Sequence, residues 1–141
     1  MTEQTFTPDF VGYWRNIDRG GLPMESGVFC VYECYYDSYK KKVYLNELIY
    51  IGESNNVNRA VFNHDKLTEW TKFVRPGHEL CYSFCALERE NRKRVAAALI
   101  YLHKPPANEE YRNNFPFPKT TIRIKGQTTM LRESFVANRR T

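Results

Sequence analysis

The sequence predicts an α+β domain in which a small three-stranded antiparallel sheet is flanked by helices. Two neighbouring runs, residues 27–36 and 43–52, are rich in the β-branched and aromatic residues that favour strands. Residues 37–42 between them are polar and have the length of a hairpin loop. A third strand-like run covers 79–87, and 89–103 carries apolar residues at helical spacing. Together these elements indicate helices packed on one small sheet.

The segment before the first predicted strand contains several residues that break regular structure. Pro8, Gly20, Gly21 and Pro23 interrupt residues 1–26. We therefore expect this segment to be irregular, apart from a short helix over Phe10–Asn16.

Two further helices are expected between the second and third strands. Ser54-Asn55-Asn56 offers N-cap residues to the helix that follows it. A second helix is expected over Lys66–Phe73, before the turn at Pro76-Gly77. The longest helix should end before Pro105-Pro106.

The last part of the chain gives a weaker pattern. Residues 115–126 indicate a proline-rich turn followed by one short strand, and residues 127–136 fit either a small helix or an extended arm.

Composition places the chain among folded proteins of one domain, residues 1–141. Hydrophobic residues make up 42% and charged residues 26%. There is no apolar stretch of membrane-spanning length and no signal-peptide pattern, so we expect a cytoplasmic protein that does not bind membranes. The net charge of +5 is compatible with a polyanionic partner such as DNA, although a solvated basic surface is the more ordinary explanation.

Two triplets at strand ends are the most specific motif. Gly27-Val28-Phe29 opens the first predicted strand, and Tyr50-Ile51-Gly52 closes the second. Arg59 and His64 follow, and the long helix leads through LIYLHKPPAN to Asn108. This order resembles the GIY-YIG endonuclease family over roughly residues 26 to 108, with 109–141 as a C-terminal extension. The resemblance implies a GIY-YIG nuclease-like fold, hydrolysis of phosphodiester bonds in DNA, and one divalent cation, Mg²⁺ or Mn²⁺.

The chemistry requires an activated water, neutralised phosphate charge and a stabilised leaving oxygen. The resemblance implies that Tyr50 is a base or hydrogen-bonds the water, and that Arg59 holds phosphate oxygens, which a planar guanidinium does well. It also implies that His64 assists proton transfer or orients the water, and that Asn108 braces the site through its amide. Each residue also has an ordinary structural explanation: a packed strand aromatic, a surface arginine, a helix-end histidine and a turn asparagine.

Substrate binding is expected around the same strand end and at the start of the long helix. Gly52 would let the backbone approach a phosphate closely, with Ser54 and Asn55 beside it. Arg92 and Lys93 would contact the DNA backbone, or simply form a solvated helix face. Tyrosines beside Lys40–Lys42 in the hairpin loop could add stacking and charge, or be ordinary exposed residues.

Two positions depart from the family pattern. Phe29 stands where the family has a tyrosine and provides no hydroxyl, which leaves the general base in doubt. Ala96 stands where the family has its metal-binding glutamate, and neither Glu88 nor Glu90 is placed on the helix to replace it. Mg²⁺ is therefore expected to bind weakly or not at all. Either the chain is an engineered Glu→Ala form of an active nuclease, or it is a natural relative that does not cut.

Two other functions remain open from the sequence. The chain could be a nucleic-acid-binding module without chemistry. It could also be a zinc-bound interaction domain, because Cys30 and Cys34 share one strand face, as do Cys81 and Cys85, although buried core cysteines explain them more simply. A nuclease with so short a chain would be weakly specific, homodimeric or recruited by a targeting partner.

Overall fold

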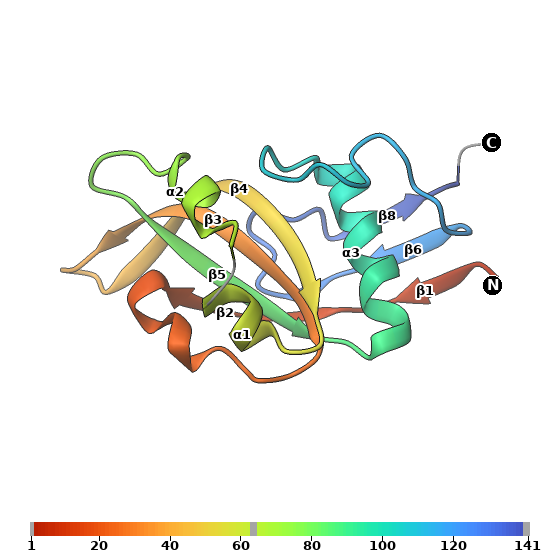
Figure 1. Ribbon diagram of the computed structural model, residues 1–141, viewed down its shortest axis with the longest axis horizontal. Helices are drawn as coiled ribbons and strands as arrows, with labels where there is room; N and C mark the ends of the chain where they lie inside the picture. The colour runs from red at the N-terminus through yellow and green to blue at the C-terminus, as the bar shows by residue number, and fades with distance from the viewer. Residues whose placement is uncertain (1, 63–64, 140–141) are drawn as a thin grey trace.

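Two β-sheets organise the chain. The computed structural model describes residues 2–62 and 65–139 (Figure 1). The larger sheet has the strand order β4-β3-β5-β2-β7, formed by β2 (Asp9–Arg15), β3 (Gly27–Asp37), β4 (Lys42–Ser54), β5 (Glu79–Ala86) and β7 (Lys125–Gly126). The smaller sheet has the order β1-β6-β8, formed by β1 (Gln4–Phe6), β6 (Thr120–Arg123) and β8 (Ser134–Ala137).

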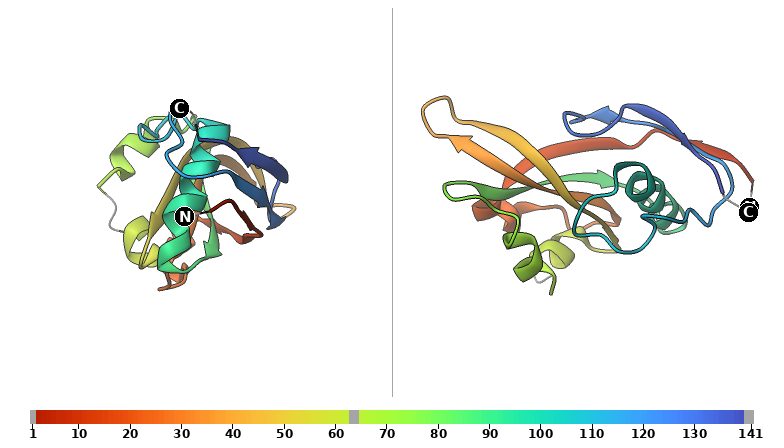
Figure 2. Two further views of the ribbon diagram at one scale, coloured as in Figure 1. Left: turned by 90° about the vertical axis from the view of Figure 1, so that its right-hand side faces the viewer. Right: turned by 90° about the horizontal axis from the view of Figure 1, so that it is seen from above.

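Helices cover both faces of the larger sheet. The long helix α3 (Arg89–His103) and the smaller sheet pack on one face, where the larger of two apolar clusters lies (Figures 1 and 2). The 3₁₀ helix η1 (Asn16–Gly21), α1 (Val57–Phe62) and α2 (Leu67–Thr71) lie against the other face around Trp70. Within residues 2–62 and 65–139, every helix is too short or too polar to cross a bilayer.

The expected fold class is wrong. The structure is mostly β, with a mixed five-stranded sheet and a second sheet of three strands, rather than one small antiparallel sheet flanked by helices. The three predicted strands do lie next to one another as β4, β3 and β5, and they pair antiparallel. The difference comes from the chain ends, which supply β1, β2, β6, β7 and β8.

The N-terminal segment is the clearest local error. Of the residues expected to form a helix over Phe10–Asn16, all but Asn16 lie in β2, and β2 pairs antiparallel with β5 and parallel with β7. Its aromatic residues suit a strand as well as a helix, and hydrogen bonding to the edge of β5 decides between them. Residues 134–137 likewise form β8, which corresponds to the extended alternative.

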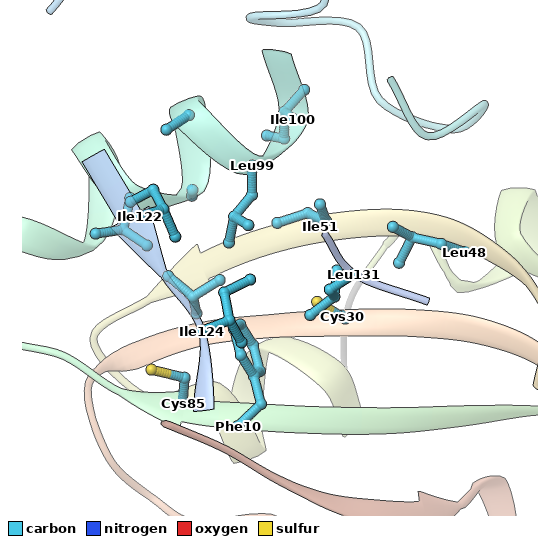
Figure 3. Close-up of a cluster of buried hydrophobic side chains, with 14 of the residues drawn as sticks. Phe10, Cys30, Leu48, Ile51, Cys85, Leu99, Ile100, Ile122, Ile124 and Leu131 are labelled. Atoms are coloured by element: carbon cyan, nitrogen blue, oxygen red, sulfur yellow. The ribbon is translucent and has the colours of Figure 1, made fainter. Parts of the chain in front are cut away.

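The central strand β3 explains why the core has two halves. Side chains alternate across a strand, so Cys30 and Tyr32 face α3 while Phe29 and Val31 face α2. All of them are buried because both faces of the sheet are covered. Figure 3 shows the α3 side of this core, with Leu99 and Ile100 on the helix and Ile51 and Cys30 on the strands.

The four cysteines belong to this core. All are buried and unoxidised, on the face that packs against α3. Burial raises the pKa of the Cys30 and Cys85 thiols to about 12, which disfavours the thiolate that zinc requires. No group of three or more His, Cys, Asp or Glu residues in the described part of the chain is placed to hold a metal ion, so the zinc-bound alternative finds no support in these residues.

A single buried arginine joins α3 to the smaller sheet. The Arg94 side chain donates from Nε to Thr120 Oγ1 at 2.8 Å and from Nη1 to Gln4 Oε1 at 2.9 Å. Its Nη2 donates to the carbonyls of Thr2, Pro118 and Lys119 at 2.9, 3.3 and 3.1 Å. Burial lowers the pKa of this guanidinium from its ordinary value, but arginine keeps its charge in proteins. One charged group therefore connects β1, β6 and the helix.

Replacing Arg94 by methionine should destabilise the fold strongly. The substitution keeps an apolar stem but removes the donor from the buried Thr120 hydroxyl and from four part-buried oxygens, so we expect a loss of about 3 kcal/mol in the free energy of unfolding. Urea denaturation followed by circular dichroism measures it. Arg89→Met, at the exposed start of the same helix, is the control and should change stability by less than about 0.5 kcal/mol. Equal effects of the two substitutions would contradict a joining role for Arg94.

Candidate functional site

A pocket of about 320 Å³ lies where β4 ends beside α3. Its walls are the end of β4, the face of α3 that points toward it, and the segment 108–111 that follows the two prolines. This volume is at the small end of the range for ligand sites.

The pocket brings together five of the residues expected at the site. Tyr50 and Gly52 come from β4, Lys93 and Ala96 from α3, and Asn108 from the loop after α3. The sequence separates these residues widely, and the packing of α3 beside β4 makes them neighbours. The motif pattern did not indicate Lys66, Glu53, Glu109, Glu110 or Tyr111, which also line the pocket.

One face of α3 forms a wall of the pocket. Lys93, Ala96 and Ile100 all line it, and their spacing places them on the same side of a helix. Ala96 is only 2% exposed and also belongs to the apolar cluster on the α3 side of the sheet. A longer side chain at position 96 would extend toward the pocket.

Asn108 fixes the loop against the end of β4. Its side-chain Oδ1 accepts a hydrogen bond from the Ile51 N–H at 2.9 Å, and its Nδ2 donates to the Ile51 carbonyl at 2.9 Å. The Ala107 N–H also donates to the Ile49 carbonyl at 3.0 Å. The amide of Asn108 thus contacts the protein backbone, and its place in the pocket is that of a positioning residue.

The Tyr50 hydroxyl is protonated at neutral pH. Burial is the main cause that raises the pKa of this phenol, and the nearby carboxylates of Glu110, Asp65, Glu53 and Glu69 raise it further. Lys66 Nζ lies 5.5 Å from the centre of the Tyr50 ring. A protonated phenol donates a hydrogen bond, so Tyr50 is suited to act as a donor rather than as a base.

Phe29 lies beneath Gly52. The Phe29 ring is 1% exposed, with its centre 6.1 Å from the Tyr50 ring and 6.3 Å from the Trp70 ring. A Cβ atom on Gly52 would come within 2.4 Å of Phe29 Cζ. The close approach at Gly52 is therefore made by the Phe29 ring, which supports the end of β4 from the face opposite α3.

The remaining expected residues lie apart from the pocket walls. Arg59 is exposed on α1, and Asn56 Oδ1 caps that helix by accepting the Arg59 N–H at 3.1 Å. Ser54 is used in the same turn, where its Oγ bonds the backbone of Asn56, and Asn55 is exposed. None of Arg59, Ser54 and Asn55 is among the described residues that line the pocket. His64 lies outside the described residues.

Arg92 is not among the described residues that line the pocket, but it is bonded to Glu53, which lines it. Its Nε donates to Glu53 Oε1 at 2.7 Å, and its Nη1 donates to Ser26 Oγ at 3.0 Å. This guanidinium therefore neutralises the Glu53 carboxylate and joins α3 to β4. Binding a phosphate through Arg92 would require it to leave these partners.

The pocket does not fit a Mg²⁺ ion. Mg²⁺ requires several oxygen ligands in near-octahedral geometry, usually including one or two carboxylates. Ala96 supplies no ligand, the Glu53 carboxylate is paired with Arg92, and Glu109 and Glu110 lie on an exposed stretch. Among residues 2–62 and 65–139, no cluster of His, Cys, Asp or Glu has the arrangement of a metal site.

Comparison with known protein families, with curated proteins and with solved structures finds no match to this chain.

The contact between Gly52 and Phe29 can be tested with a double-mutant cycle. Gly52→Ala forces a methyl group against the Phe29 ring, and such overpacking should cost about 1–3 kcal/mol in the free energy of unfolding. In a Phe29→Leu chain, which lacks the two nearest ring atoms and keeps only the looser contact with the Tyr50 ring, the same substitution should cost less by more than about 0.5 kcal/mol. Thermal or urea unfolding of the four chains gives the coupling. Additive effects would show that the ring does not limit position 52.

Proposed function

We propose that this pocket binds the phosphodiester backbone of DNA and is a GIY-YIG endonuclease site without its metal ligand, so that this chain binds DNA without cutting it. The main support is the meeting, in one pocket, of Tyr50, Gly52, Ala96 and Asn108, the positions that the motif resemblance groups together.

A phosphate in this pocket would meet one hydroxyl donor and two ammonium groups. Tyr50 would donate its proton to a phosphate oxygen, and Lys66 and Lys93 would balance the negative charge. Glu109 and Glu110 oppose anion binding, whereas Glu53 is already neutralised by Arg92. Affinity should therefore depend strongly on the two lysines.

The described residues at this pocket do not supply what hydrolysis of a phosphodiester requires. The metal ion of the family would supply charge neutralisation at the leaving oxygen. Ala96 offers no carboxylate, Phe29 offers no hydroxyl, and Tyr50 keeps its proton. These residues can hold and orient a phosphodiester, but they do not activate a water.

A second candidate is a nucleic-acid-binding module that does not need chemistry at this pocket. The observation that favours it is Phe29, whose buried ring packs against Gly52 and Trp70 and so has a structural role of its own. The two candidates differ in what a carboxylate at position 96 would do.

Ala96→Glu should convert the chain into a metal-dependent nuclease. The new carboxylate would extend from the wall of α3 into the pocket and provide a ligand for Mg²⁺ or Mn²⁺. We expect it to nick supercoiled plasmid in the presence of either ion, whereas the unchanged chain and Ala96→Gln do not. Ala96→Gln is the matched control because it has nearly the same size and no charge.

The outcome separates the two candidates. Nicking by Ala96→Glu alone supports the nuclease site and shows that a hydroxyl at position 29 is dispensable. If Ala96→Glu and the double variant Phe29→Tyr/Ala96→Glu fold and bind DNA without nicking it, the nuclease proposal is wrong and the binding module remains. Absence of DNA binding by every chain contradicts both.

Removing the pocket lysines should weaken binding to duplex DNA. Lys66→Gln/Lys93→Gln removes two cations, so the slope of log K against log salt concentration should fall by up to about 2, at about 0.9 per phosphate contact. Fluorescence anisotropy over a salt series measures the slope. Lys125→Gln, on the edge strand β7, is the single-charge control and should leave the slope nearly unchanged. If the native chain and the double variant give equal slopes, duplex DNA binds at a site other than this pocket.

A further inference from the structure

The longest hairpin of the fold carries a surface that the pocket does not use. We call residues 35–44 the basic hairpin; they are the outer ends of β3 and β4 and the turn between them. In the right-hand view of Figure 2 this hairpin projects from the body of the molecule. Its tip is therefore accessible to a partner from several sides.

The tip presents an aromatic ring and several cations together. Tyr39 is 98% exposed, and Lys40, Lys41 and Lys42 follow it directly, all exposed. Tyr35 and Tyr44 lie opposite each other in the strand register and are 46% and 39% exposed. Residues in direct register share one face of a strand pair, so these two rings form a second aromatic surface behind the tip.

Hydrogen bonds and ring contacts hold the hairpin in its conformation. Asp37 Oδ1 accepts the backbone N–H of Tyr39 at 2.9 Å and that of Lys40 at 3.1 Å, which closes the turn and uses the one carboxylate in the segment. At the base, the Tyr35 ring lies 5.7 Å from His78, and His78 Nδ1 lies 2.9 Å from Glu33 Oε1. The Arg15 guanidinium lies 3.7 Å from the centre of the Tyr36 ring. The tip residues are therefore presented on a supported stem.

This combination fits a single-stranded nucleic acid. Single strands bind proteins by stacking their bases on exposed aromatic rings while lysines contact the phosphates. Bases in a duplex are already stacked on one another, so an exposed Tyr39 ring gains a partner from an unpaired base. A membrane surface is less suited, because the tip offers tyrosine and serine rather than the tryptophan, phenylalanine and leucine that enter lipid.

We propose that the basic hairpin binds a single-stranded nucleic-acid segment, with an unpaired base stacked on Tyr39 and its phosphates held by Lys40, Lys41 and Lys42. This proposal depends on the proposed function in one respect, that the ligand is a nucleic acid. It adds a second contact region, distant in the fold from the pocket, and a preference for DNA with unpaired bases.

The test compares fluorescein-labelled oligothymidylate with a labelled duplex by fluorescence anisotropy. Tyr39→Ala should weaken binding to the single strand about tenfold, since it removes the ring on which one base stacks. Tyr39→Phe retains the ring and should bind within about twofold of the native chain. Replacing all three lysines by glutamine should lower the single-strand salt slope by about 2, at about 0.7 per contact. Binding to the duplex should change little with Tyr39→Ala.

The outcomes distinguish this proposal from the one for the pocket. A single-strand affinity that Tyr39→Ala leaves unchanged, or that Tyr39→Phe lowers as much as Tyr39→Ala, overturns the role of the hairpin. If the hairpin variants lose affinity while Lys66→Gln/Lys93→Gln does not, the pocket proposal fails and the hairpin stands. If Lys66→Gln/Lys93→Gln loses affinity while the hairpin variants do not, the hairpin proposal fails and the pocket proposal stands. Vesicles of phosphatidylserine and phosphatidylcholine complete the test, because Tyr39-dependent binding to vesicles without binding to DNA identifies a membrane surface and overturns the proposal.

Discussion

The fold depends on one buried guanidinium. Arg94 reaches from α3 to Gln4, Thr120 and three backbone carbonyls, all neutral oxygens, and so connects segments from both ends of the chain. Burying a charge without a carboxylate is costly, and a full set of hydrogen bonds makes it tolerable. The smaller sheet thereby acquires a defined position on α3, in addition to its apolar contacts through Phe6, Ile122 and Phe135. The contacts with the smaller sheet thus fix the orientation of α3 on the side of the helix that faces away from the pocket.

The candidate site follows from that arrangement. Two residues beyond Arg94, Ala96 lies on the wall that faces the pocket, and Arg92 joins the same helix to Glu53 and Ser26. On the other side, Asn108 and Ala107 hydrogen-bond the backbone at the end of β4. The Phe29 ring supports Gly52 from beneath. The pocket is thus held by polar contacts on two walls and by ring packing below, and its chemistry is decided by the few side chains that project into it.

The sequence predicted the central elements well and the periphery poorly. The runs 27–36, 43–52 and 79–87 and the helix 89–103 correspond closely to β3, β4, β5 and α3, because strong periodicity marks buried elements. The partners of short strands are set by contacts between distant parts of the chain, such as Gln4 with Thr120, which local patterns do not contain. The same limit applies to the site. The motif alone groups Tyr50, Ala96 and Asn108, whereas Lys66 and Glu110 reach the pocket only through the fold. Arg59 and Arg92 have plausible residue types, yet one is exposed on α1 and the other is paired with Glu53.

The loop that carries Asn108 has a consequence for self-association. β4 is the outermost strand of the larger sheet on its side, and an outermost strand offers unpaired backbone groups to strands of other molecules. Around Ile49 and Ile51 these groups are already bonded to Ala107 and Asn108, so a second chain cannot add a strand there. Toward the turn, Lys42 places a positive charge on the same strand and would repel an identical neighbour. The residues that shape the pocket thus also guard the chain against aggregation by edge-to-edge strand pairing.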